Sequence, residues 1–273
     1  MTARHEGSTR PRRVAREAQD SAALRFAARG GYVASGVVHL IVGVLVIAVA
    51  FGGDGVADQT GAFRAIAGAP LGFVLLWIAA IALVALAVWQ VLDGVLVRRR
   101  GEVKKWGARL VEWGKALVFL ALGVVAAAVA VGARPDPDGS VADASRGLIA
   151  LPGGPVLLGA IGIGILASGI GFAVAGVRRR YLEQLDLPSG VAGTAVTWLA
   201  VIGFVAKGLA LVTVGVLLLV AAIRLSPEDA GGLDAAIDGL VALPAGPALC
   251  LVIGIGLIAY GVFLVCRSKL QRL

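Results

Sequence analysis

The sequence predicts an all-α integral membrane protein with six transmembrane helices, arranged as three parallel helical-hairpin repeats. Three observations carry this prediction: a very apolar composition, six long apolar runs and an internal repeat. Of the 273 residues, 59% are hydrophobic and only 15% are charged, with a net charge of +8. An average soluble domain is ~45–50% apolar and ~25% charged. The composition therefore excludes an ordinary soluble enzyme, a disordered chain and a disulfide-rich secreted domain.

Each of the six apolar runs is long enough to cross a bilayer as a helix, which takes about 20 residues. The bilayer core offers no water to the backbone, so helices are the expected form. The runs cover residues 31–51, 71–97, 111–131, 155–177, 196–223 and 247–266.

The lysines and arginines predict how the chain is oriented. They cluster before the first run, between the second and third, after the fourth and after the sixth, whereas the other three connections are mainly acidic. By the positive-inside rule, both termini are cytoplasmic. We expect a multi-pass protein of the bacterial plasma membrane with a basic cytoplasmic arm at 1–28. The three repeats then cover 29–100, 101–180 and 181–273.

The repeat is clearest in the second helix of each hairpin. The segment "LPGGPVLLGAIGIGILASG" recurs 92 residues later as "LPAGPALCLVIGIGLIAYG", with its prolines and glycines in the same places. In the first helices a small residue stands seven positions before a glycine, so both lie on one helix face. Such faces let helices approach closely in lipid. Parallel repeats are related by an axis along the membrane normal, which predicts a pseudo-threefold bundle. The small pairs are Gly36 and Gly43, Ala116 and Gly123, and Gly208 and Gly215.

A short segment precedes each second helix. The segment "GLDAAIDGLVAL" has helical apolar spacing and reads as an amphipathic helix on the outer surface. Arg64, Arg146 and Asp238 fall at equivalent positions in the three segments, which predicts an inter-repeat salt bridge at the outer surface. We interpret that bridge as structural.

These segments resemble a known family. "GGYVASGVVHLIVGVLVIAVA", "GFVAKGLALVTVGVLLLVAA" and "AGGLDAAIDGLVALPAGP" are similar to the three-repeat, six-helix bacterial membrane family catalogued as domain of unknown function number 1206. The resemblance covers nearly all of residues 29–267, and the middle repeat is its weakest part. It implies a six-helix membrane fold, and it supplies no activity and no functional residues.

Three equivalent positions in the first helices hold polar side chains, Ser35, Lys115 and Lys207. Ionisable residues inside a span are functional hypotheses by default, because burying their charge is costly. In a pseudo-threefold bundle the three would lie at one depth and could form a ring that binds an anion or a lipid phosphate. The alternative is that both lysines extend to the headgroups. Lys207 lies deeper and is harder to explain in that way.

His39 is the one histidine inside a span, one helical turn above Ser35 on the face that carries Gly36 and Gly43. Histidine titrates near neutral pH, so a proton-coupled role is one hypothesis. The alternative is a neutral imidazole that hydrogen-bonds to a neighbouring helix.

We find no catalytic constellation, metal-ligand spacing or cofactor motif in the sequence. We therefore expect a non-enzymatic membrane protein with a lipid-binding or structural and accessory role. The alternative is a small transporter or channel for an anion or a proton-coupled solute, using Lys207 and His39. The expected partners are membrane lipids, anionic on the cytoplasmic side, and a larger membrane complex. Nucleic acid is not expected, because topology accounts for the basic clusters.

Overall fold

The computed structural model describes residues 13, 15, 17–18, 21–53, 55–97, 102–179, 181–182 and 185–271. Most of the basic arm expected at 1–28 lies outside these residues, and its last part belongs to the first long helix. Six helices are long and apolar enough to cross a membrane. They are α2 (Ala22–Ala50), α4 (Gly72–Leu96), α5 (Glu102–Ala130), α7 (Gly154–Arg178), α8 (Val191–Arg224) and α10 (Gly246–Leu270).

A short helix precedes the second long helix of each repeat: α3 (Gln59–Ala67), α6 (Pro137–Ile149) and α9 (Leu233–Val241), with the 3-10 turn η2 (Pro227–Asp229) before α9. The first two begin at aspartates whose carboxylates accept a backbone N–H of the first turn, Asp58 from Gly61 and Asp136 from Gly139. This is standard N-capping. The predicted outer segments are therefore helical.

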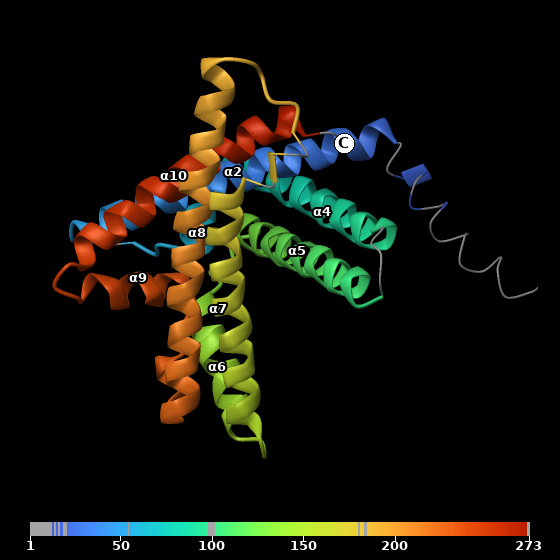
Figure 1. The fold of residues 1–273 in the computed structure, drawn as a ribbon. Coiled ribbons are helices and arrows are strands. Elements are labelled where there is room, and N and C mark those ends of the chain that lie inside the picture. Colours follow the sequence, from blue (N-terminus) through green and yellow to red (C-terminus); the bar gives the residue numbers. More distant parts are fainter. Residues whose placement is uncertain are drawn as a thin grey trace, which may run out of the picture.

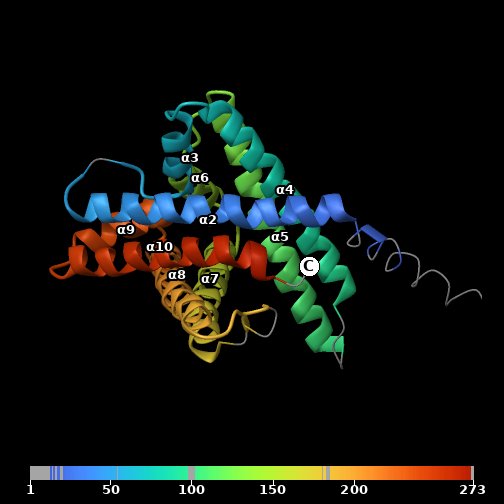
Figure 2. The same ribbon diagram turned by 90° about the horizontal axis from the view of Figure 1, so that it is seen from above.

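The long helices form three tight pairs, and each pair joins two different repeats. Helix α10 packs along α2, α5 along α4, and α8 along α7. The second helix of each repeat thus lies against the first helix of the next, and the third repeat closes the circle on the first. The three pairs run in clearly different directions (Figure 1), and the view from above shows the same crossing (Figure 2).

The predicted small-residue faces form these pairs. A Cβ added to Gly43 would lie 2.6 Å from the carbonyl oxygen of Gly254, and one added to Gly254 would lie 2.8 Å from that of Gly43. In the α7–α8 pair, a Cβ on Gly208 would lie 2.6 Å from the carbonyl oxygen of Gly169. Gly123 approaches α4 at Ala80 in the third pair. At these distances the backbones themselves are in contact, which is how helices associate in lipid.

Within a repeat, the two long helices meet only at a crossing, which we call the corner of that repeat. At the first corner, α2 and α4 meet at Gly31, where an added Cβ would lie 2.5 Å from Ala82 O and from Leu86 Cβ. At the third corner, α8 and α10 meet at Gly203, where it would lie 2.5 Å from Tyr260 Cα. These are the closed corners.

The second repeat differs at its corner. Helices α5 and α7 make no comparable contact with each other in the described part of the chain. Residue 111, which corresponds to Gly31 and Gly203, is a valine whose side chain is 56% exposed. Ser168, which corresponds to Leu86 and Tyr260, is also exposed. A Cβ added to Gly107, Gly114, Gly164 or Gly171 would meet nothing within 4 Å. We call this region, with Val111 and Ser168 at its centre, the open corner.

Candidate functional site

The site is built around Lys207, which lies near the middle of α8. Its Nζ lies 3.2 Å from Nε2 of His39 on α2. It also lies 4.6 Å from the ring centre of Tyr260 on α10 and 5.4 Å from that of Phe172 on α7. A cation over an aromatic face is attracted by the ring quadrupole. The amine therefore contacts three helices from all three repeats, which places it inside the ring of helices.

The hydrogen bonds fix the tautomer of His39. Its Nδ1 lies 2.7 Å from the backbone carbonyl oxygen of Ser35. A carbonyl can only accept, so Nδ1 carries a hydrogen, and in a neutral imidazole Nε2 is then the acceptor. Lys207 donates to that acceptor. The chain of hydrogen bonds runs from the ammonium through the imidazole to the helix backbone.

Lys207 lacks a counter-charge. In the part of the chain that the structure describes, no carboxylate forms an ion pair with it. Its other neighbours are rings: Phe204 stacks on Phe172 and packs against Tyr260. The side chain is nevertheless only partly buried, while His39 and Tyr260 are buried. The amine is thus enclosed on the sides of α2, α7 and α10 and retains some access.

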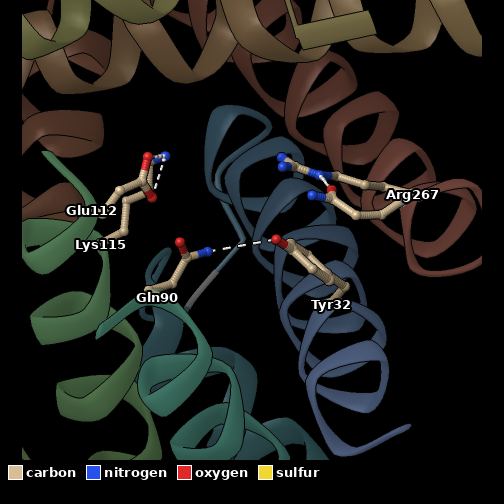
Figure 3. A network of polar contacts seen from close by, with 6 residues as sticks. Tyr32, Gln90, Glu112, Lys115 and Arg267 are labelled. Atoms are coloured by element: carbon tan, nitrogen blue, oxygen red, sulfur yellow. Dashed lines mark hydrogen bonds and ion pairs between the residues drawn. The ribbon is translucent and has the colours of Figure 1, made fainter. Parts of the chain in front are cut away.

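The expected ring of Ser35, Lys115 and Lys207 is brought together only in part. Ser35 contributes its carbonyl to the His39–Lys207 chain. Lys115 instead pairs at 3.0 Å with Glu112 one turn earlier on α5, and its side chain is 44% exposed (Figure 3). Lys115 therefore pairs within α5 and does not join Lys207 and His39.

A second polar network lies at the end of the helices where α2 begins and α10 ends. Gln90 of α4 points toward the buried hydroxyl of Tyr32, at 3.5 Å, and the guanidinium of Arg267 lies 4.9 Å from the Tyr32 ring centre (Figure 3). Arg267 also donates through Nε to Gln271. This network ties the first and third repeats together, and we interpret it as structural.

At the opposite end, polar side chains link the three short-helix segments in a circle. Arg64 of the first repeat donates to the carbonyl of Pro135 in the second, at 2.7 Å. Asp138 of the second accepts from the backbone N–H of Ala235 in the third, at 3.0 Å, and from that of Gly232. Asp234 of the third accepts from Ala57 N–H in the first. We call these three links the clasps.

The structure does not bring Arg64, Arg146 and Asp238 together as a salt bridge. Arg146 pairs with Asp143 on its own helix, where both side chains are exposed. Arg64 serves in a clasp instead, and Asp238 forms no ion pair among the described residues. Of the three residues, only Arg64 links two repeats, and its partner is a backbone carbonyl.

Several carboxylates lie close together around the clasps, and they are partly buried. Burial raises the pKa of Asp58 and of Asp234, and the nearby Asp138 raises both further. The described residues contain no group of three or more His, Cys, Asp or Glu that could hold a metal ion. Asp58, Asp138 and Asp234 accept hydrogen bonds from backbone N–H groups at or just before the beginnings of α3 and α9.

Sequence reasoning missed the two rings beside Lys207 and the partners of the clasps. Tyr260 and Phe172 sit at unremarkable apolar positions. The pairing of α7 with α8 across repeats brings Phe172 to Lys207, and the closed corner of the third repeat brings Tyr260 there. A signal for the open corner was present, because the first helices carry glycine at positions 31 and 203 and valine at 111.

Comparisons with known proteins agree with this architecture. The family described as Domain of Unknown Function (DUF1206) matches residues 30–96, 113–179 and 202–270, one match for each repeat. The chain belongs to the DUF1206 family. It is also 26% identical over 257 residues to the uncharacterized protein YxxB of Bacillus subtilis (strain 168), covering 90% of both chains. No solved structure matches it. This DUF1206 chain is therefore a multi-pass membrane protein with three repeats.

Proposed function

We propose that this DUF1206 protein is a non-enzymatic membrane protein that binds an anionic amphiphile of the bilayer at Lys207. One observation carries the proposal: an ammonium group lies inside the ring of helices, and no carboxylate of the described residues pairs with it. Even a partly buried charge inside a membrane span is unfavourable without a counter-charge. The anionic group of a ligand would supply the missing charge.

The open corner supports the same function. In the described part of the chain it is the corner at which the long helices of a repeat do not pack, and Val111 at its centre has Gly107 and Gly114 about one helical turn away on either side. An apolar tail fits such a surface. The groups that contact the amine are an imidazole and aromatic rings, rather than a nucleophile with its base, so we infer binding instead of catalysis.

Native mass spectrometry can test this function with two matched lysine variants. The protein would be released from nanodiscs that contain phosphatidylglycerol or phosphatidylcholine, as wild type, Lys207→Met and Lys115→Met. We expect anionic lipid or co-purified anionic amphiphile to stay on wild type and on Lys115→Met, whose lysine already pairs with Glu112. Lys207→Met should lose it. Equal retention by all three proteins would contradict the proposal.

A second candidate function is transport of an anion together with a proton. The hydrogen bond between Lys207 and His39 favours it, because this pair can hold a proton in the middle of a span. Proteoliposomes that contain a pH-sensitive dye would report proton entry when lactate is added outside. Uptake that depends on both side chains would support transport, and uptake equal to that of empty liposomes would count against it.

The orientation proposed from the sequence, with both termini cytoplasmic in the plasma membrane, can be tested separately. A reporter that is active only in the cytoplasm, fused after Leu273, should be active. A structural or accessory role in a larger membrane complex would instead appear as a stable partner in mild detergent, retained in Lys207→Met.

A further inference from the structure

The chemistry around Lys207 identifies the class of amphiphile. Resting on the lipid-binding function proposed above, we infer that the ligand is a single-chain carboxylic acid. Its carboxyl group binds beside Lys207 and His39, with one oxygen facing each, and its alkyl chain leaves through the open corner between α5 and α7. In this proposal, Lys207 binds the headgroup, His39 accepts its proton and the open corner is the path of the alkyl chain.

The donors match a carboxylate. Nζ of Lys207 and Nε2 of His39 lie 3.2 Å apart, so the two oxygens of one planar carboxylate can each face one nitrogen. On the other sides of the amine stand the aromatic faces of Tyr260 and Phe172. One anionic group with two acceptors satisfies the site.

Depth favours a free acid over a phospholipid headgroup. Sixteen residues of α8 precede Lys207, which corresponds to about 24 Å of helix, and a similar length follows it. A phosphate group belongs to the headgroup region, about 15 Å from the middle of the bilayer. A carboxylic acid in its neutral form carries no such anchor, and it can enter the apolar region.

Binding balances as a single proton transfer. The acid arrives as R–COOH. Its O–H bond breaks, and the proton forms a new bond with Nε2 of His39, whose Nδ1–H already donates to Ser35. Protonated Nε2 can no longer accept from Lys207, so that hydrogen bond breaks, and the resulting carboxylate accepts one hydrogen bond from the imidazolium and one from the ammonium of Lys207. The site holds a charge of +1 before and after binding, and no other reactant is needed.

The open corner gives the alkyl chain a way out. Phe172, which covers Lys207, is the neighbour of Gly171 on α7, and Gly171 has open space where a Cβ would be. The positions that correspond to Ser168 hold Leu86 and Tyr260 in the other repeats, and both are buried in closed corners. The smaller side chain of Ser168 leaves the corresponding space in the second repeat unfilled, so we place the alkyl chain of the ligand there.

The test uses the full-length protein in phosphatidylcholine nanodiscs and palmitate labelled with ¹³C at its carboxyl carbon. His5→Ala leaves His39 as the one histidine, so ¹⁵N-histidine spectra report its protonation. We expect a bound carboxylate resonance, and both imidazole nitrogens of His39 shifting to protonated values as palmitate binds. This measurement on the unaltered site needs no further variant. A bound resonance with His39 still neutral would overturn the proton transfer.

Variants test the headgroup and the path separately. Lys207→Met and Lys207→Gln should abolish palmitate binding. Ser168→Trp, which fills the open corner, should weaken it at least tenfold, while Ile163→Trp on an exposed part of α7 should leave it unchanged. Full binding by Ser168→Trp would overturn the path.

The two proposals can fail independently. If phosphatidylglycerol depends on Lys207 but palmitate does not bind, the lipid-binding function stands and the carboxylic acid is wrong. If neither probe binds to wild type, both proposals fail.

Discussion

The corners of the three repeats are built on one plan, and they differ at one pair of positions. In the first and third repeats, Gly31 and Gly203 let the second helix lie against the backbone of the first. In the second repeat, Val111 occupies that place and the helices stay apart. The comparison teaches that a repeat can keep its helices and its tight pairs while its corner stays open, here where Val111 and Ser168 replace the residues of the closed corners.

The sharpest way to break this comparison is to put the same side chain at all three corners. Gly31→Leu and Gly203→Leu place a Cβ 2.5 Å from atoms of the opposite helix, so the helices must shift apart. We expect each to lower the free energy of unfolding by about 3 kcal/mol or more.

Val111→Leu at the open corner is the matched control. Its side chain is exposed, and the change should stay within about 0.5 kcal/mol. Thermal unfolding in detergent measures all three variants. Equal destabilisation at the three positions would refute the distinction between closed and open corners.

The reverse substitution sharpens the comparison. Val111→Gly gives the second repeat the residue that closes the other two corners, so α5 and α7 should approach each other. In a background without Cys250 and Cys266, spin labels at Leu110 and Ile163 would report the separation by pulsed electron resonance. We expect the distance distribution to move to shorter values. An unchanged distribution would show that Val111 does not hold the corner open.

The clasps should contribute less than the corners. Asp234→Ala leaves the N–H of Ala57 without its acceptor, and we expect a loss of about 1–2 kcal/mol. Asp234→Asn keeps an oxygen acceptor and should lose less. Chemical denaturation of wild type and the two variants measures these losses in the free energy of unfolding. Equal losses would indicate that charge, rather than the hydrogen bond, holds the clasp.

The same carboxylates predict a pH dependence. Burial raises the pKa of Asp58 and Asp234, so the folded protein binds more protons than the unfolded chain between the usual aspartate value and the raised one. Stability should therefore fall as pH rises through that interval and level off above it. Asp58→Asn with Asp234→Asn should flatten the profile. A profile that rises with pH in wild type would contradict this account.

The smallest effect is expected at Arg146. Its ion pair with Asp143 is exposed and lies on one helix, so Arg146→Ala should change stability by about 0–1 kcal/mol. Thermal unfolding of this variant beside Asp234→Ala compares a surface pair with a clasp. A larger loss of stability in Arg146→Ala than in Asp234→Ala would contradict the interpretation that the clasp contributes more than the surface ion pair.

Much of the fold could be predicted from the sequence, because apolar length and small-residue spacing are local properties. The six spans, the short helices and the glycine faces all follow from them. The pairing of α2 with α10 could not be predicted, since the glycine spacing identifies a face but not its partner. Lys207 and His39 were predicted as candidate residues. Their contact with each other, and the diversion of Lys115 to Glu112, depend on which helices surround each side chain.

The most direct test of the account compares three equivalent positions in one experiment. In the background without native cysteines, spin labels would replace Leu86, Ser168 and Tyr260 in turn, in nanodiscs. Collisions with dissolved oxygen, which concentrates in the lipid phase, measure the access of each label. We predict high oxygen access at 168 and low access at 86 and 260. Equal access at all three positions, or the lowest access at 168, would contradict the open corner and the path to Lys207.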